Sequence, residues 1–217
     1  MNFIFDLDGT LINTENIAIP AIRQLLKDLG YNPNIEKEEI LQYIGYTIDD
    51  IFYGLLNTKD PEIIEKAIKL LDKYEIEIIE KLPKNEIFFD GAIEVLKTLK
   101  NENHTLYILS NCNKKYLNAL LEKELNKYID FPHCSEMYNW AEKDYVLKLI
   151  TKGKKDFVMI GDRHKDVDAA KKNGILSVGC TYGYALEEVK DADFIIYDIK
   201  ELLTIKNKII ESAYNTI

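Results

Sequence analysis

Three short apolar runs, widely separated along the chain, each lead into a polar residue of possible chemical use. They are residues 3–5 before Asp6, residues 106–109 before Ser110, and residues 157–160, one glycine before Asp162. Between them, apolar residues recur at helical spacing, so strands and helices alternate. Such alternation builds a parallel sheet, and α/β proteins bind ligands at the carboxyl ends of those strands. The pattern predicts an α/β fold with a functional site at that rim.

The same patterns predict the individual elements outside residues 14–85. The expected strands cover residues 2–6, 105–109, 157–160, 176–180 and 194–196. The expected helices cover residues 92–99, 114–125, 142–150, 166–173 and 199–214. Residues 126–139 follow neither period, so we expect them to be irregular.

Strand signals are missing between residues 14 and 85, where only helical spacing is found. Helices are expected at about 17–29, 36–44, 48–56 and 61–79. Pro61 suits the first turn of the last helix, and Pro83 ends that helical stretch. With 217 residues, the chain is long enough for a core and a small second domain. We therefore expect a core domain of residues 1–13 and 86–217 and a helical domain of residues 14–85.

Composition limits the classes of partner. The chain has 28 basic and 37 acidic side chains and a formal net charge of −9, which argues against nucleic acid and anionic membranes. Neither a signal peptide nor an apolar run near the ~18 residues of a membrane span is evident. The three cysteines are scattered and odd in number, which suits a reducing compartment. A cytoplasmic monomer acting on a small molecule is the expectation.

The first apolar run ends in the most informative residues of the chain. Asp6 and Asp8 are two residues apart, so an extended backbone directs both side chains to one side. Two neighbouring carboxylates are unfavourable unless a cation or an acid/base task holds them there. Gly9 allows a sharp turn, and Thr10 adds a hydroxyl and an amide. Asp6 and Asp8 are therefore candidates for catalysis and metal binding.

A second acidic pair follows the third apolar run. Asp162 and Asp166 flank the expected start of a helix, where capping the helix is an alternative role for them. Together with Asp6 they would form an oxygen-rich cluster, which suits Mg²⁺ because this hard ion prefers carboxylate, carbonyl and water ligands. We expect Mg²⁺ as the cofactor.

Four segments in order resemble the haloacid dehalogenase (HAD) superfamily. Residues 6–10 resemble its first motif, DxDGT, and residues 161–166 resemble its fourth, GDxxxD. Ser110 matches the second motif, and Lys143 matches the third, with Lys148 as the alternative lysine. Residues 161–183 resemble the phosphoglycolate phosphatase and 5′-nucleotidase-like branch, and the helical insert resembles its C1 cap. The resemblance implies a Rossmann-like, doubly wound parallel sheet with a helical cap inserted after the first strand.

The resemblance also implies a reaction and the role of each residue. Members with both aspartates are mostly Mg²⁺-dependent phosphatases that form an aspartyl-phosphate, here on Asp6, while Asp8 acts as general acid and base. The metal ligands would be Asp6, the backbone carbonyl of Asp8, Asp162 and Asp166. The groups that hold the phosphate oxygens would be Thr10, Ser110, Asn111 and Lys143, with backbone amides contributing near Asn111 and at residues 9–10.

The resulting prediction is a phosphatase for a small phosphate monoester, with phosphoglycolate, a nucleotide or a sugar phosphate as candidates. A sugar phosphomutase of the β-phosphoglucomutase type remains an alternative, because it shares the core and the cap. A non-catalytic, phospho-accepting protein is a further alternative, although receiver domains lack a helical insert. In the insert, Arg23, Tyr46 and Thr47 are candidates to reach the substrate.

Overall fold

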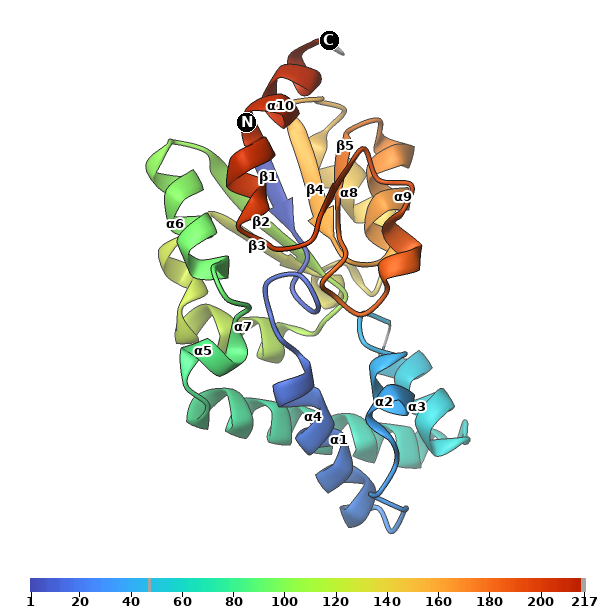
Figure 1. The fold of residues 1–217 in the computed structure, drawn as a ribbon. Coiled ribbons are helices and arrows are strands. Elements are labelled where there is room, and N and C mark those ends of the chain that lie inside the picture. The colour runs from blue at the N-terminus through green and yellow to red at the C-terminus, as the bar shows by residue number, and fades with distance from the viewer. Residues whose placement is uncertain (47, 216–217) are drawn as a thin grey trace.

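The structure, a computed structural model, describes residues 1–46 and 48–215. Its centre is a six-stranded sheet in the order β3-β2-β1-β4-β5-β6, in which all neighbouring strands are parallel. The strands are β1 (Asn2–Phe5), β2 (Thr105–Ser110), β3 (Phe131–Cys134), β4 (Phe157–Gly161), β5 (Leu176–Cys180) and β6 (Phe194–Ile196). The predicted parallel α/β fold is confirmed (Figure 1).

The central strands are apolar because both faces of the sheet are covered by helices. Residues on one face, such as Phe3 and Phe5, share a core cluster with residues of α6 (Ala92–Asn101), α7 (Lys114–Lys123) and α10 (Glu201–Asn215). Residues on the other face, such as Ile4 and Met159, share a cluster with residues of α8 (Lys143–Thr151) and α9 (His164–Asn173). Helices on both faces make the sheet doubly wound, as expected.

The pairing register of β1 with β2 and β4 brings the carboxyl ends of these three strands together. Phe5, the last residue of β1, pairs with Ile108 of β2 on one side and with Ile160 of β4 on the other. The Asp6 amide continues this ladder by donating to the Ile160 carbonyl at 2.9 Å. Residues that follow these strands therefore start from neighbouring positions at one edge of the molecule.

Four helices between β1 and β2 form a helical insert next to that edge (Figure 1). They are α1 (Glu15–Asp28), α2 (Lys37–Leu41), α3 (Ile48–Leu56) and α4 (Pro61–Lys81). The insert has its own cluster of buried residues, which includes Leu25, Ile40 and Phe52. Helix α4 begins as predicted, because the Asp60 side chain accepts from the Glu62 amide at 2.9 Å. It packs against both α1 and α7, so it connects the insert with the sheet and the helices that flank it, here called the sheet domain.

Several local predictions were wrong. The helix expected at residues 36–44 ends at Leu41, and residues 42–44 form a turn. Residues 131–134, expected to be irregular, form the edge strand β3 beside β2. Pro132 obscured this strand, although a proline is tolerated at a sheet edge. Helix α9 begins at His164, two residues before the predicted start, and the short α5 (Lys84–Ile87) was not predicted. In the part of the chain that the structure covers, no helix combines the length and apolar character needed to cross a membrane.

Candidate active site

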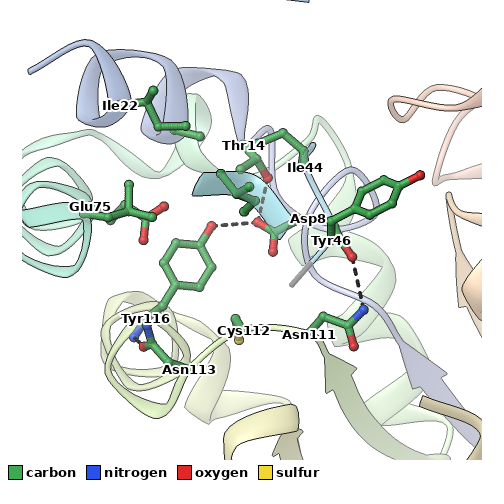
Figure 2. A pocket seen from close by; sticks show the side chains of 14 residues that line it. Asp8, Thr14, Ile22, Ile44, Tyr46, Glu75, Asn111, Cys112, Asn113 and Tyr116 are labelled. Carbon is green, nitrogen blue, oxygen red and sulfur yellow. Dashed lines mark hydrogen bonds between the residues drawn. The ribbon is translucent and has the colours of Figure 1, made fainter. Parts of the chain in front are cut away.

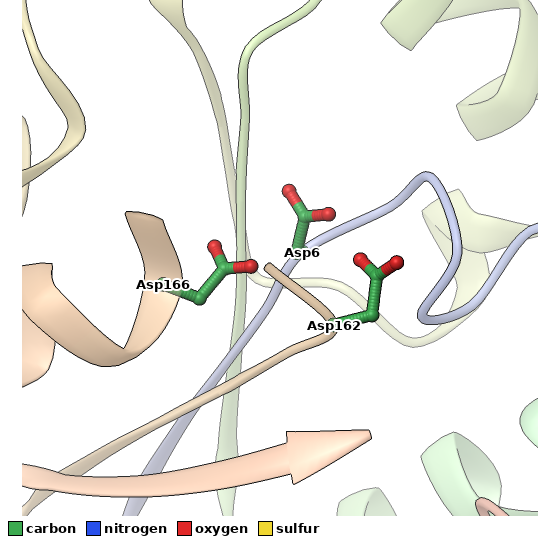
Figure 3. Close-up of side chains that lie close together, drawn as sticks. All are labelled: Asp6, Asp162 and Asp166. Carbon is green, nitrogen blue, oxygen red and sulfur yellow. The ribbon is translucent and has the colours of Figure 1, made fainter. Parts of the chain in front are cut away.

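Three aspartates from two distant parts of the sequence meet at the carboxyl edge of the sheet (Figure 3). Asp6 follows β1, Asp162 follows β4, and Asp166 lies in the first turn of α9. One carboxylate oxygen from each lies within 4.8 Å of the others, and all three residues are buried. The structure therefore brings together three of the four predicted metal ligands through their side chains.

Glycines make room for these carboxylates. A Cβ on Gly9 would lie 2.2 Å from Oδ2 of Asp162, and a Cβ on Gly161 would lie 2.2 Å from Oδ2 of Asp166. Gly9 also has a φ of +77°, which a residue with a Cβ adopts only with strain. The glycines of both motifs therefore allow the backbone to approach the acidic side chains closely.

Lys143 adds one positive charge to the cluster. Its ammonium, at the start of α8, donates to Oδ1 of Asp6 at 2.8 Å and to Oδ1 of Asp166 at 2.6 Å. The lysine is only 6% exposed, whereas Lys148 on the same helix is exposed to solvent. Of the two lysines considered from the sequence, Lys143 is the one that reaches the carboxylates.

The cluster carries more negative charge than Lys143 balances. Burial raises the pKa of Asp6 well above its usual range, although Lys143 opposes that shift. Burial, with Asp166 nearby, raises the pKa of Asp162 to about 7. Oδ2 of Asp162 accepts from the Tyr184 amide at 2.9 Å, but Oδ1 is buried without a hydrogen-bond partner. A divalent cation fits this site, because it would satisfy that oxygen and balance the excess charge.

The Asp8 carboxylate is not part of this cluster; it lies between Thr14 and Tyr116 (Figure 2). Its Oδ1 accepts hydrogen bonds from the Thr14 hydroxyl and from the Tyr116 hydroxyl, each at 2.8 Å. Burial raises the pKa of Asp8, although both hydrogen bonds oppose the shift. The two aspartates of the first motif thus have different surroundings: Asp6 belongs to the acidic cluster, and Asp8 is oriented by two hydroxyl groups.

The three other predicted phosphate-binding residues are less closely tied to the cluster. Thr10 is fully buried, its amide donates to the Leu7 carbonyl, and its hydroxyl has no partner. Ser110 is buried at the end of β2, beside the end of β1. The Asn111 amide group donates to the Gly45 carbonyl of the insert at 3.1 Å. These residues surround the site, whereas Lys143 contacts Asp6 directly.

A cavity lies between the sheet domain and the helical insert, beside Asp8 (Figure 2). Asn111 and Tyr116 line it from the sheet domain, and Tyr46 lines it from the insert. Tyr46, a candidate to reach the substrate, thus lines this cavity. Arg23 instead donates to the Ile35 carbonyl within the insert, and it does not line this cavity. Thr47 lies outside the described residues.

Sequence reasoning missed four residues at this site. Thr14 and Tyr116 orient Asp8, Glu75 lines the cavity from α4, and Arg163 contacts the insert. The Arg163 guanidinium donates to the Ile44 carbonyl at 2.6 Å and to the Leu41 carbonyl at 3.2 Å. The position of Arg163 inside the fourth motif was the one available signal. The other three belong to no motif. Thr14 lies six residues after Asp8 and Tyr116 lies on α7, whereas Glu75 reaches the site through the packing of α4 against α7.

Comparison with known proteins supports a single family. A family model described as haloacid dehalogenase-like hydrolase matches residues 3–180. Pyrophosphatase PpaX of Listeria innocua is 26% identical over 213 residues, which cover 93% of this chain and 94% of that protein. Phosphoglycolate phosphatase of Vibrio parahaemolyticus is 26% identical over 222 residues, which cover 93% of each chain.

Solved structures share the fold over nearly the whole chain. The crystal structure of a predicted phosphatase from Clostridium acetobutylicum has a TM-score of 0.79 and 25% identity, covering 95% of this chain and 98% of that one. β-Phosphoglucomutase from Clostridium difficile has a TM-score of 0.79 and 21% identity, covering 97% of both chains. The resemblance found in the sequence motifs is confirmed: this chain belongs to the haloacid dehalogenase-like hydrolase family of enzymes.

Proposed function

We propose that the protein is a Mg²⁺-dependent phosphatase that hydrolyses a small phosphate monoester through an aspartyl-phosphate on Asp6. The observation that carries this proposal is the buried cluster of three aspartates with Lys143 beside Asp6. Such a cluster suits a hard divalent cation and an anionic phosphoryl group. Named relatives that act on phosphoglycolate and pyrophosphate agree with this class of reaction.

The residues that would hold Mg²⁺ are Asp6, Asp162, Asp166 and the backbone carbonyl of Asp8. Bound there, the ion would offset the charge of the carboxylates and so allow an anionic phosphate to approach Asp6. Lys143 would serve the same purpose for the phosphate oxygens. A unit-charge contact at ~4 Å is worth about 4 kcal/mol at an effective dielectric near 20. Ser110, Thr10 and backbone amides near Asn111 would complete the phosphate site.

The two aspartates of the first motif divide the chemistry. The Asp6 carboxylate attacks phosphorus, and the bond from phosphorus to the leaving oxygen breaks as Asp8 donates a proton to that oxygen. Asp8 then removes a proton from a water molecule, which attacks the aspartyl-phosphate and releases phosphate. The raised pKa of Asp8 supports this role, because a proton donor must hold its proton near neutral pH.

We propose further that residues 14–85 act as a cap domain on a core of residues 1–13 and 86–217. The cavity beside Asp8 has one wall from each part, so the insert would exclude water and select the leaving group. All three cysteines are buried and free, which agrees with a reducing, cytoplasmic location. We propose that a single chain suffices for activity, because both walls of the site come from it.

Phosphate release from p-nitrophenyl phosphate with Mg²⁺ tests the proposed function. We expect turnover that EDTA abolishes and that Asp6→Asn lowers by at least ~10³-fold, since the attacking oxygen is lost. Lys148→Ala, an exposed lysine on the same helix as Lys143, is the matched control and should retain activity. No turnover by the unaltered enzyme, or undiminished turnover in Asp6→Asn, would contradict the proposal.

A phosphomutase reaction is the second candidate function, because a structural neighbour is named β-phosphoglucomutase. Incubation with a hexose 1-phosphate separates the two reactions. A phosphatase releases inorganic phosphate and free hexose, whereas a mutase produces the hexose 6-phosphate without net release of phosphate.

A further inference from the structure

Glu75 places a carboxylate in the cavity beside Asp8. It projects from α4 toward the Tyr116 hydroxyl (Figure 2). No hydrogen bond or ion pair joins its carboxylate to another residue within the described ranges. One turn earlier on the same helix, Asp72 is fully occupied: it accepts from the Asn113 amide group at 2.7 Å and from the Lys115 ammonium at 2.9 Å. Lys115 therefore pairs with Asp72 and not with Glu75. Lys73, two residues from Glu75, lies over the Tyr74 ring instead.

The rest of the cavity wall offers Glu75 no positive charge. Among the described lining residues there is no lysine, arginine or histidine, and the acidic ones are Asp8 and Glu75. The apolar part of the lining includes Ile22, Ile44 and Leu71. Arg163, although near the insert, is held by backbone carbonyls and by the Glu188 carboxylate at 3.2 Å. A ligand in this cavity therefore meets two carboxyl groups, neutral polar side chains such as Asn113, and apolar surface, but no cationic side chain of the described lining.

The surroundings of Glu75 make a positively charged ligand favourable. Burial raises the pKa of Glu75 well above its usual value, and the charges of Asp8 and Asp72 add to that shift. An ionised Glu75 is thus unfavourable in the free protein. An ammonium group beside it would relieve both the desolvation and the repulsion, whereas a carboxylate or second phosphate would add to them.

We propose that Glu75 selects the leaving group, and that the substrate is a phosphate monoester of an amino alcohol. This inference rests on the proposed function, because the phosphate of such a substrate would lie at Asp6 while its ammonium group reaches Glu75. The cavity beside Asp8 is where the leaving oxygen takes its proton, so the remainder of the alcohol extends into it. The substrate class then differs from phosphoglycolate and pyrophosphate, for which two relatives are named.

Two phosphate esters of similar size test the charge preference. O-Phosphoethanolamine ends in an ammonium group, 2-phosphoglycolate ends in a carboxylate, and 2-hydroxyethyl phosphate is the uncharged reference. We expect kcat/KM for phosphoethanolamine to exceed that for phosphoglycolate by about 10- to 100-fold, the range that one charge contact supplies at a partly screened site. The uncharged ester should lie between them.

Variants of Glu75 assign the preference to this residue. Glu75→Gln should remove most of the ratio between the two substrates, and Glu75→Lys should invert it, because the charge at that position changes sign. Glu80→Gln, an exposed position on the same helix, is the matched control and should keep the ratio of the unaltered enzyme. Thermal unfolding of each variant monitors folding. If a variant does not fold, the charge preference is measured in the unaltered enzyme instead. The measured quantity is then the ratio of the two ester concentrations that half-inhibit p-nitrophenyl phosphate hydrolysis.

The outcomes separate the two proposals. If the unaltered enzyme hydrolyses p-nitrophenyl phosphate but prefers phosphoglycolate, or if Glu75→Gln keeps the ratio, the inference about Glu75 is wrong and the phosphatase stands. If no ester is hydrolysed, the phosphatase is wrong. The shift of the unfolding midpoint by each ester with Mg²⁺ then decides the inference: a larger shift by phosphoethanolamine supports it, and an equal or larger shift by phosphoglycolate overturns it.

Discussion

At the scale of single residues, Asp6 and Asp8 show how position changes the chemistry of one side chain. Asp6 has carboxylate neighbours and Lys143, which suits metal binding and attack on phosphorus. Asp8 has two hydroxyl donors and faces a cavity, which suits proton transfer to a leaving group. A bend at Leu7, just after β1 ends, separates the two roles.

Asp8→Asn tests the proton-transfer role. The amide cannot donate or remove the proton, so we expect kcat to fall by about 10²- to 10⁴-fold. The amide oxygen can still accept from Thr14 and Tyr116, so the unfolding midpoint should change little. Asp168→Asn, an exposed position on α9, serves as the control. A kcat within ~2-fold of the unaltered enzyme would remove Asp8 from the mechanism.

Gly9→Ala tests whether close approach to Asp162 is required. The added Cβ meets Oδ2 of Asp162 at 2.2 Å and also takes a strained φ of +77°. We expect urea denaturation to show a loss of about 2–4 kcal/mol, which combines backbone strain with overpacking. Gly30→Ala is the matched control, since φ is +81° there but nothing lies within 4 Å of the added atom. It should lose only about 1–2 kcal/mol; equal losses in the two variants would argue against the close approach.

At the scale of elements, Arg163 connects the fourth motif with the insert. Its guanidinium donates to two carbonyls of the insert and to Glu188. A lysine keeps the charge but cannot reproduce this set of planar contacts. We therefore expect Arg163→Lys to raise KM by about 5- to 10-fold, the equivalent of one lost hydrogen bond of typical strength, with a smaller change in kcat.

Steady-state kinetics and the Mg²⁺ concentration for half-maximal activity distinguish this effect from damage to the metal site. The Mg²⁺ requirement should stay unchanged in Arg163→Lys. Lys171→Gln, at the other end of α9, is the control. A lower kcat with an altered Mg²⁺ requirement would show that Arg163 acts on the carboxylate cluster instead of on the insert.

Glu124 joins α5 to the end of α7 and makes stability depend on pH. Its carboxylate is 8% exposed and pairs with Lys84 and Lys127. Hydrogen bonds from Lys84 and then Lys127 lower the pKa of Glu124 from 4.5 to about 2. Since the folded state lowers this pKa, the pairing stabilises the fold above pH 4.5, and the stabilisation is lost as pH falls toward 2.

Thermal unfolding of Glu124→Gln across pH checks this dependence. We expect a midpoint about 2 °C lower than that of the unaltered protein at pH 7, with the difference shrinking below pH 4.5. Glu122→Gln, an exposed neighbour, should show no such trend. A difference that stays constant down to pH 2 would mean that Glu124 acts through packing instead of charge.

At the scale of the whole molecule, the sequence predicted what local pattern determines. Buried apolar runs with polar ends identified β1, β2 and β4, and the order of four motifs identified Asp6, Lys143, Asp162 and Asp166. It did not predict β3, whose four residues are stabilised by pairing with β2 at the sheet edge. It also did not predict Tyr116, which belongs to no motif, or Glu75, because the approach of Glu75 to Asp8 depends on how α4 packs against α7.

The most direct test of the central claim is a crystal structure of the enzyme with Mg²⁺ and beryllium fluoride, which mimics a phosphoryl group on a carboxylate. The account predicts one Mg²⁺ bound at about 2.1 Å to oxygens of Asp6 and Asp162, with the fluoride group attached to Asp6. Lys143 should then contact the fluoride atoms. A structure without Mg²⁺ at these aspartates, or with the fluoride group on another residue, would contradict the account.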